Sequence, residues 1–188
     1  MTPVVGVLAL QGGFAAHARV LRSLGADVRE VRVPADLEGL DGLVLPGGES
    51  TTMTLGIERE GLADPLREFA ASGAPVFGTC AGLIMLDREH LGIMDILARR
   101  NAFGRQVHSF EEAMVFPDLE GEPVRAVFIR APWIEEHGPD VEILASVDGH
   151  PVAARQGGLT VIAFHPELGN DTRLHERFLD EIRQRQDS

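Results

Sequence analysis

Short, continuous apolar runs that alternate with segments of helical periodicity constrain this chain more than any other feature. Residues 4–10 read VVGVLAL, and further short runs follow at 43–45 and 75–78. A strand that is apolar on both faces is typical of a parallel sheet covered by helices on both sides. We expect helices over 14–24, 51–60 and 62–72, and an alternating strand over 27–33. The first half therefore predicts an α/β fold.

The second half of the chain has a different pattern. Strand-like segments occur at 124–130, 141–147, 151–155 and 159–164, and Asp-Gly and Gly-Gly turn signals at 148–149 and 157–158 indicate an antiparallel meander. Residues 172–186 predict a final amphipathic helix. The chain has 188 residues, no internal repeat and no linker of Pro/Ser-rich composition. We therefore expect a single domain over 1–188.

Composition narrows the classes of function. With 17 Lys+Arg against 29 Asp+Glu the formal net charge is −12, which disfavours nucleic-acid binding. No apolar stretch approaches the roughly 20 residues of a membrane span. No basic residue precedes the first apolar run, so a signal peptide is not expected. With one cysteine, Cys80, no intramolecular disulfide can form, and the reducing cytoplasm fits. No metal or cofactor motif is present, and we expect neither.

The most informative segment is Gly78-Thr79-Cys80-Ala81-Gly82, between a buried strand and a helix. A glycine two residues before and after a nucleophile at a strand-to-helix turn is the pattern of a nucleophile elbow. Cys80 would lie at the positive end of a helix, which favours a thiolate. A buried structural cysteine is the alternative. The flanking glycines favour the nucleophile.

A cysteine nucleophile usually works with a base, and His165 is the best candidate among seven histidines. It follows an apolar strand, at the end of the sheet where α/β sites form. Glu167, two residues later, can orient the imidazole through its second nitrogen. A solvated loop histidine beside a loop acid is the alternative interpretation.

Two further loops follow predicted strands. Pro46-Gly47-Gly48-Glu49-Ser50 has two glycines whose backbone N–H groups can approach a ligand and form an oxyanion hole. An ordinary turn with a serine cap is the alternative. Gln11 lies at the tip of the first strand, beside the expected site.

With these segments in place, the chain resembles the class I, triad-type glutamine amidotransferases. More narrowly, it is similar to the glutaminase subunits of pyridoxal 5′-phosphate synthases. The matching segments are VLALQG (7–12), LPGGESTTM (45–53), FGTCAGLI (77–84), NAFGRQ (101–106), FIRAP (128–132) and FHPEL (164–168). Of these, LPGGESTTM, NAFGRQ and FIRAP together carry the narrower resemblance. The resemblance implies a three-layer, Rossmann-like fold with a mainly parallel sheet and an antiparallel extension. It also implies hydrolysis of L-glutamine to L-glutamate and ammonia.

The resemblance also implies roles for individual residues. Cys80 would be the nucleophile, His165 the base and Glu167 the residue that orients it. The remaining positions that match the family would contact glutamine: Gly47, Gly48, Glu49, Arg105, Ile129 and Arg130. Ammonia would pass to a partner synthase subunit that forms a dodecameric core and builds pyridoxal phosphate from a pentose phosphate and a triose phosphate. We hypothesise that Gln11 couples docking of that partner to formation of the oxyanion hole.

Three other interpretations remain open. The chain could be the glutaminase subunit of a different amidotransferase, which the triad does not distinguish. It could be a redox or holdase protein with a cysteine elbow, which would need neither His165 nor Glu167. It could also be an interaction subunit without catalysis, although the intact triad argues against that.

Overall fold

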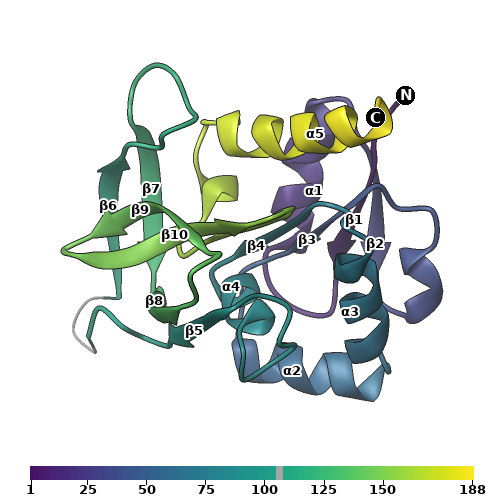
Figure 1. Cartoon of the computed structure of the whole chain (residues 1–188), viewed down its shortest axis with the longest axis horizontal. Helices are drawn as coiled ribbons and strands as arrows, with labels where there is room; N and C mark the ends of the chain where they lie inside the picture. The colour runs from purple at the N-terminus through teal and green to yellow at the C-terminus, as the bar shows by residue number, and fades with distance from the viewer. Residues whose placement is uncertain (105–107) are drawn as a thin grey trace.

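A seven-stranded sheet forms the centre of the computed structural model, which describes residues 1–104 and 108–188 (Figure 1). The strand order is β2-β1-β3-β4-β11-β10-β9. The first five of these strands are parallel, and β10 and β9 continue the sheet antiparallel. Their bounds are β1 Val4–Leu8, β2 Asp27–Val31, β3 Gly42–Leu45, β4 Val76–Thr79, β9 Glu142–Val147, β10 His150–Gln156 and β11 Leu159–Ile162. The expected parallel sheet with an antiparallel extension is therefore confirmed.

Helices cover both faces of this sheet, as the apolar runs predict. Figure 1 shows α1 (Phe14–Ser23) and α5 (Arg173–Gln186) on one side. On the other side lie α2 (Ser50–Arg59), α3 (Ala63–Ala71) and the short α4 (Ala81–Leu86). Two 3₁₀ turns, η1 (Pro34–Leu37) and η2 (Pro166–Leu168), complete the helical elements of the described residues. The central strands β1, β3 and β4 are buried almost throughout, because both of their faces meet helices.

The region between α4 and β9 differs from the expectation. The segment predicted as strand 124–130 is β7 (Val124–Ile129), but it pairs with β6 (Ser109–Met114) in a separate two-stranded sheet and not with the meander. A second small sheet pairs β5 (Ile96–Arg99) with β8 (Trp133–His137). The prediction missed β5, β6 and β8. The latter two contain consecutive glutamates and expose much of their length, so their sequences have a weak strand signal.

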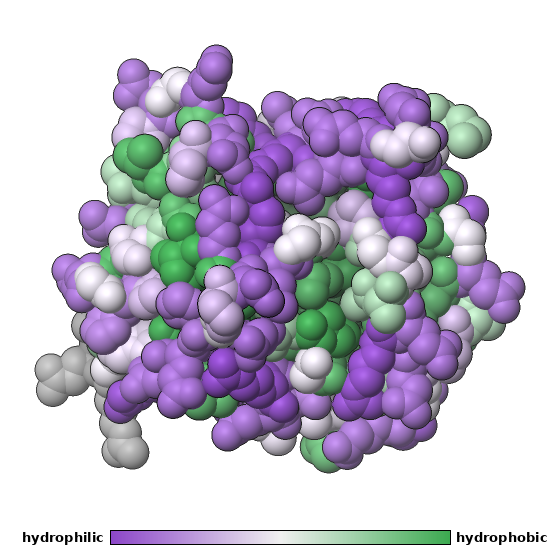
Figure 2. Space-filling view, viewed as in Figure 1, coloured by the Kyte–Doolittle hydropathy of each residue, from purple (hydrophilic) through white to green (hydrophobic). Residues whose placement is uncertain are grey.

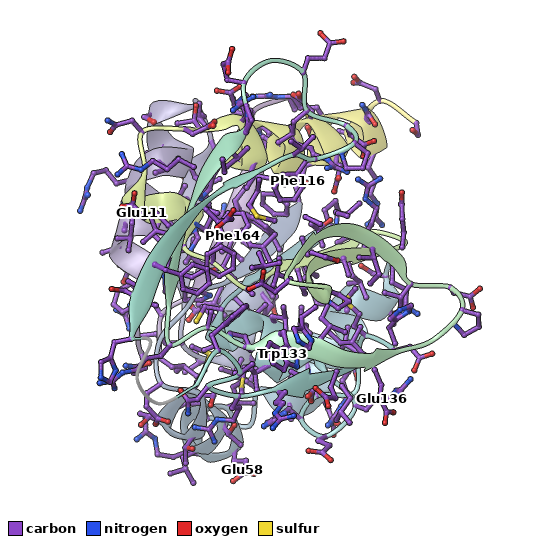
Figure 3. The ribbon with its side chains drawn as sticks, turned by 90° about the vertical axis from the view of Figure 1, so that its left-hand side faces the viewer. Glu58, Glu111, Phe116, Trp133, Glu136 and Phe164 are labelled. Carbon is purple, nitrogen blue, oxygen red and sulfur yellow. The ribbon has the colours of Figure 1, made fainter. Side chains whose placement is uncertain are left out.

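Aromatic packing joins β7 to the main sheet just beside the end of β11. The rings of Phe128 and Phe164 lie 5.4 Å apart, and Phe116 packs on Phe164 at 6.1 Å. In Figure 3, Phe116 and Phe164 point into the interior, whereas Glu58, Glu111 and Glu136 point outward. The apolar residue before His165 is thereby held in the core.

The outer surface is mostly polar. Hydrophilic side chains cover most of the face shown in Figure 2, and hydrophobic residues appear mainly in recesses between them. Among residues 1–104 and 108–188, no helix combines the length and the apolar character needed to cross a bilayer.

Candidate active site

Cys80 lies at the sharp turn between β4 and α4, as the glycine pattern predicts. Its backbone has φ 51° and ψ −106°, an uncommon conformation for a residue with a Cβ. The Cys80 N–H donates to the carbonyl of Ile162 on β11 at 2.8 Å, which holds the turn against the neighbouring strand. Backbone strain of this kind is found where a side chain must be presented to a site.

The two glycines of the elbow are needed for close packing. A Cβ on Gly82 would lie 2.0 Å from the carbonyl oxygen of Leu45, and one on Gly78 would lie 2.9 Å from the carbonyl oxygen of Gly82. The start of α4 therefore packs directly on the end of β3. Any larger residue at position 82 would push the helix away from the sheet and move Cys80 with it.

His165 and Glu167 stand at the end of β11, facing the elbow. The backbone N–H of His165 donates to the carbonyl of Val127 at 2.9 Å. Its Nδ1 lies 2.7 Å from Oε1 of Glu167, and because a carboxylate only accepts, Nδ1 carries the proton. With Nδ1 facing Glu167, Nε2 is the ring nitrogen that remains for the Cys80 sulfur, which lines the same pocket. The three residues predicted from the sequence are thus brought together in the order Cys80, His165, Glu167.

The electrostatics of this trio favour a charged imidazole. Burial alone would lower the pKa of His165, but its hydrogen bonds and charge interactions with Cys80 and Glu167 raise that pKa to about 10. Burial alone would raise the pKa of Glu167, but the hydrogen bond from His165 and the neighbouring His17 hold it below its ordinary value. At neutral pH the arrangement is an imidazolium between a carboxylate and the sulfur.

The glycine-rich loop after β3 packs against both His165 and the tip of β1. A Cβ on Gly47 would lie 2.6 Å from Cε1 of His165. The Gly47 carbonyl accepts from the N–H of Gly13 at 2.9 Å, and because C=O and N–H of a trans peptide point in opposite directions, the Gly48 N–H points away from Gly13. Gln11 Oε1 accepts from the Glu49 N–H at 2.7 Å, so the sequence-predicted Gln11 directly contacts this loop.

Glu49 has a local structural task. Its carboxylate caps α2 by accepting from the backbone N–H groups of Thr51 (3.1 Å) and Thr52 (2.7 Å) and from the Thr52 hydroxyl (2.6 Å). The Thr52 hydroxyl and these backbone N–H groups lower the pKa of Glu49 to about 2. The side chain is therefore negatively charged at the rim of the site.

A pocket of about 410 Å³ opens above Cys80 and His165. It is lined by Gly48, Glu49, Ile129 and Arg130 among the predicted residues. The Cys80 sulfur lies 4.0 Å from the Ile129 carbonyl, and Arg130 has a left-handed backbone with φ 44°. The predicted contact Arg105 lies outside the described residues.

Reasoning from the sequence missed two groups of residues. Arg100 and Asn101 line the pocket, and Arg100 approaches Glu49 at 3.5 Å. Their only signal was position, since Asn101 begins the NAFGRQ segment and Arg100 directly precedes it. Behind Glu167, His17 and His175 are fully buried. His17 stands three residues after Phe14 and four before Leu21 on the apolar face of α1, and that placement could have identified it.

The described residues contain no cluster of three or more His, Cys, Asp or Glu side chains able to hold a metal ion. The groups that line the pocket can provide a sulfur nucleophile, an imidazole for proton transfer and backbone N–H groups that stabilise an oxyanion.

Sequence comparison agrees with that chemistry. The model of the SNO glutamine amidotransferase family matches residues 7–184. A Corynebacterium jeikeium protein named pyridoxal 5′-phosphate synthase subunit PdxT is 52% identical over 97% of this chain and 98% of its own. A Streptomyces coelicolor protein of the same name is 51% identical, covering 97% of this chain and 95% of its own.

Comparison of structures gives a consistent result. A crystal structure described as a glutamine amidotransferase superposes with a TM-score of 0.88 at 44% identity, covering 95% of this chain and 98% of the other. A Thermoplasma acidophilum structure described as a putative GMP synthase subunit a has a TM-score of 0.75 at 20% identity, covering 100% of this chain and 97% of the other. The second likeness shows the shared fold alone.

Proposed function

Because this chain belongs to the SNO glutamine amidotransferase family, we propose that it hydrolyses L-glutamine at Cys80 and supplies the ammonia to a synthase subunit that makes pyridoxal 5′-phosphate. The observation that carries the proposal is the Cys80 elbow with His165 beside it and Glu167 2.7 Å from the imidazole. The relatives at about half identity over nearly the whole chain support the choice of synthase.

The first half of the reaction is acyl transfer to Cys80. The sulfur attacks the side-chain carbonyl carbon of glutamine and forms a tetrahedral oxyanion. The Gly48 N–H, which faces away from Gly13, and the Ala81 N–H at the start of α4 are the donors that we assign to that oxyanion. The His165 imidazolium gives its proton to the nitrogen as the C–N bond breaks. Ammonia leaves, and a γ-glutamyl thioester remains on Cys80.

The second half reverses the roles. Neutral His165 takes a proton from a water molecule, which attacks the thioester carbon, and the C–S bond breaks. L-Glutamate leaves and the thiolate–imidazolium pair is restored. Glu167 keeps its charge throughout and holds Nδ1–H of His165, so that Nε2 always faces the sulfur.

The amino-acid end of glutamine needs charged partners. Glu49, negatively charged at the pocket rim, offers a partner for the α-ammonium. Arg105 and Arg130 are the cations that we assign to the α-carboxylate, through the paired donors that suit such a group. We assign backbone contacts with the substrate to Ile129, whose carbonyl already faces Cys80.

The partner is a synthase subunit, and we propose, from the family resemblance, that it forms a dodecameric core surrounded by glutaminase subunits. Gln11 is our candidate for coupling the two activities, since its side chain connects the tip of β1 to the loop that supplies the oxyanion hole.

The test is glutamate release from glutamine, measured with and without the synthase subunit and with Cys80→Ala as control. We expect release that requires Cys80 and increases when the synthase is added. Release that is unaffected by this synthase would reject the partner, and release that persists in Cys80→Ala would reject the nucleophile.

A further inference from the structure

A series of buried polar side chains lies behind Glu167, on the side away from Cys80. Oε2 of Glu167 lies 3.3 Å from Nε2 of His17 on α1. The same nitrogen lies 3.1 Å from the hydroxyl of Thr79 on β4. Nδ1 of His17 is 2.9 Å from Nε2 of His175 on α5. Side chains from three elements far apart in the sequence thus meet behind the carboxylate that orients His165.

His17 and His175 are both neutral. Burial lowers the pKa of His17 to about 4 and that of His175 to about 3, in spite of the nearby Glu167 carboxylate. A neutral imidazole has one N–H donor and one acceptor nitrogen, so the contacts decide which nitrogen carries each proton.

One assignment of the protons fits these contacts best. A lone pair on Nε2 of His17 would repel Oε2 of Glu167, 3.3 Å away, so Nε2 carries the proton, and the Thr79 hydroxyl accepts it at 3.1 Å. Nδ1 of His17 is then an acceptor. Nε2 of His175 must therefore donate to it. This leaves Nδ1 of His175 as a bare acceptor, and it has no partner among the described residues. The opposite assignment would aim a lone pair at the carboxylate and bury a donor N–H without an acceptor, which costs more.

We propose that His17 is a positioning residue of the glutaminase reaction: its Nε2–H lies against the outer oxygen of Glu167 and stabilises the charge there, and His175 fixes the tautomer of His17. The proposal rests on the proposed function, since Glu167 matters only if His165 is catalytic. Oε2 of Glu167 has no hydrogen-bond partner in the described part of the chain, and Nε2 of His17, 3.3 Å away, is the charge-stabilising contact on that side. A carboxylate held at one oxygen alone rotates more freely, and His165 rotates with it.

The groups around Glu167 determine what a change at position 17 does. His165, with Cys80 beyond it, faces Oε1, and His17, with Thr79 and His175 behind it, faces Oε2. Removing the donor at position 17 destabilises the ionised carboxylate and leaves the glutamine pocket untouched, because His17 does not line it. A substitution at position 17 should therefore change kcat and the acidic limb of the pH profile, and leave KM unchanged.

The test compares His17→Leu, which removes the donor, with His17→Gln, whose amide N–H can replace Nε2–H. Leu21→Ala, one turn later on the buried face of α1, is the matched control for lost packing. Assays include the synthase subunit. For His17→Leu we expect kcat to fall about 10–100-fold at unchanged KM. Removing a residue that orients a metal-binding side chain has an effect of this size. We also expect the acidic limb of kcat/KM to move up by about one pH unit. His17→Gln should restore most of both.

Unchanged kcat in His17→Leu, or the same shift of the limb in Leu21→Ala, would overturn the proposal. Nitrogen NMR of the unmodified chain gives a readout that needs neither folded variants nor turnover. We expect His17 and His175 to be neutral and protonated at Nε2 from pH 6 to 8. A proton on Nδ1 of His17, or a charged His17, would also overturn it. Wild-type protein without glutaminase activity would instead reject the proposed function.

Discussion

In the proposed mechanism, the chemistry of this site depends most on Glu167 after Cys80. One oxygen accepts from His165 at 2.7 Å, and the carboxylate is one of the two groups that raise the pKa of that imidazole. Its side chain is almost fully buried, so water cannot replace it. A neutral amide in its place keeps the shape and removes the charge.

Glu167→Gln should therefore lower kcat, by about 10⁴-fold if the carboxylate acts as it does in serine-protease triads. The pKa of His165 should fall, because a partner that raises it is gone, so the basic limb of the pH profile should move to lower pH. Glutamate release measured from pH 6 to 10 checks both effects. A wild-type rate, or a basic limb that does not move, would show that Glu167 is only a loop acid.

At the scale of elements, the site depends on how closely α4 lies on β3. The contact is between backbones: the position of a Gly82 Cβ is 2.0 Å from the carbonyl oxygen of Leu45. Neither a strand nor a helix propensity encodes this distance. It arises because both elements reach the same edge of the sheet and the residue at their crossing has no side chain.

Gly82→Ala should lower the free energy of unfolding by about 1–3 kcal/mol or more, since backbone atoms cannot move aside as flexible side chains do. It should also displace Cys80 and reduce glutaminase activity. Urea denaturation measures the first effect. Gly169→Ala is the control: its φ is −98°, and the nearest atom to an added Cβ is 3.8 Å away. A stability loss of equal size in the two variants would contradict the packing argument.

For the molecule as a whole, the buried histidines link folding to pH. The pKa of His17 is about 4 and that of His175 about 3 in the folded chain, against an ordinary value of 6.5. Between these values the unfolded state binds more protons than the folded state. The contribution of the two neutral histidines to the free energy of unfolding is therefore present above pH 6.5 and is lost as the pH falls through the folded pKa values.

Stability should accordingly fall between pH 6.5 and 5, by up to about 2 kcal/mol for each histidine. Urea denaturation at a series of pH values measures this change, and His175→Gln should make it shallower by removing one of the two groups. A flat profile over this range in the unmodified chain would contradict the neutral, buried state of both residues.

The coupling to the partner that we propose for Gln11 also belongs to the scale of the whole molecule. Oε1 of Gln11 accepts a hydrogen bond from the Glu49 N–H at 2.7 Å, across 38 positions of sequence. A displacement of the tip of β1 would therefore also move the glycine-rich loop. Gln11→Ala should weaken the increase in glutamate release that the synthase produces, and should leave folding intact. Gln156→Ala removes a similar amide-to-backbone contact, with the Asp95 N–H at 2.8 Å, outside the pocket lining, and serves as the control. Full stimulation of Gln11→Ala would reject the coupling role.

Much of this protein was already determined by local patterns in its sequence. The apolar runs at residues 4–10, 43–45 and 75–78 predicted buried parallel strands, because only helices on both faces can cover such segments. The strand-to-helix turn with glycines at 78 and 82 predicted the elbow at Cys80. The strand limits were less exact: β1 and β2 each end two residues before the predicted limit, where the chain turns toward the next element.

The tertiary structure decided the rest, because it depends on contacts between segments distant in the chain. The placement of β7 beside β6, outside the meander, follows from pairing and aromatic packing that the alternation within one strand does not specify. His17, Thr79 and His175 have no common motif, and only the packing of α1, β4 and α5 brings them to Glu167. A sequence pattern identifies residues that act through neighbours along the chain, whereas residues that act through space appear only once the chain is folded.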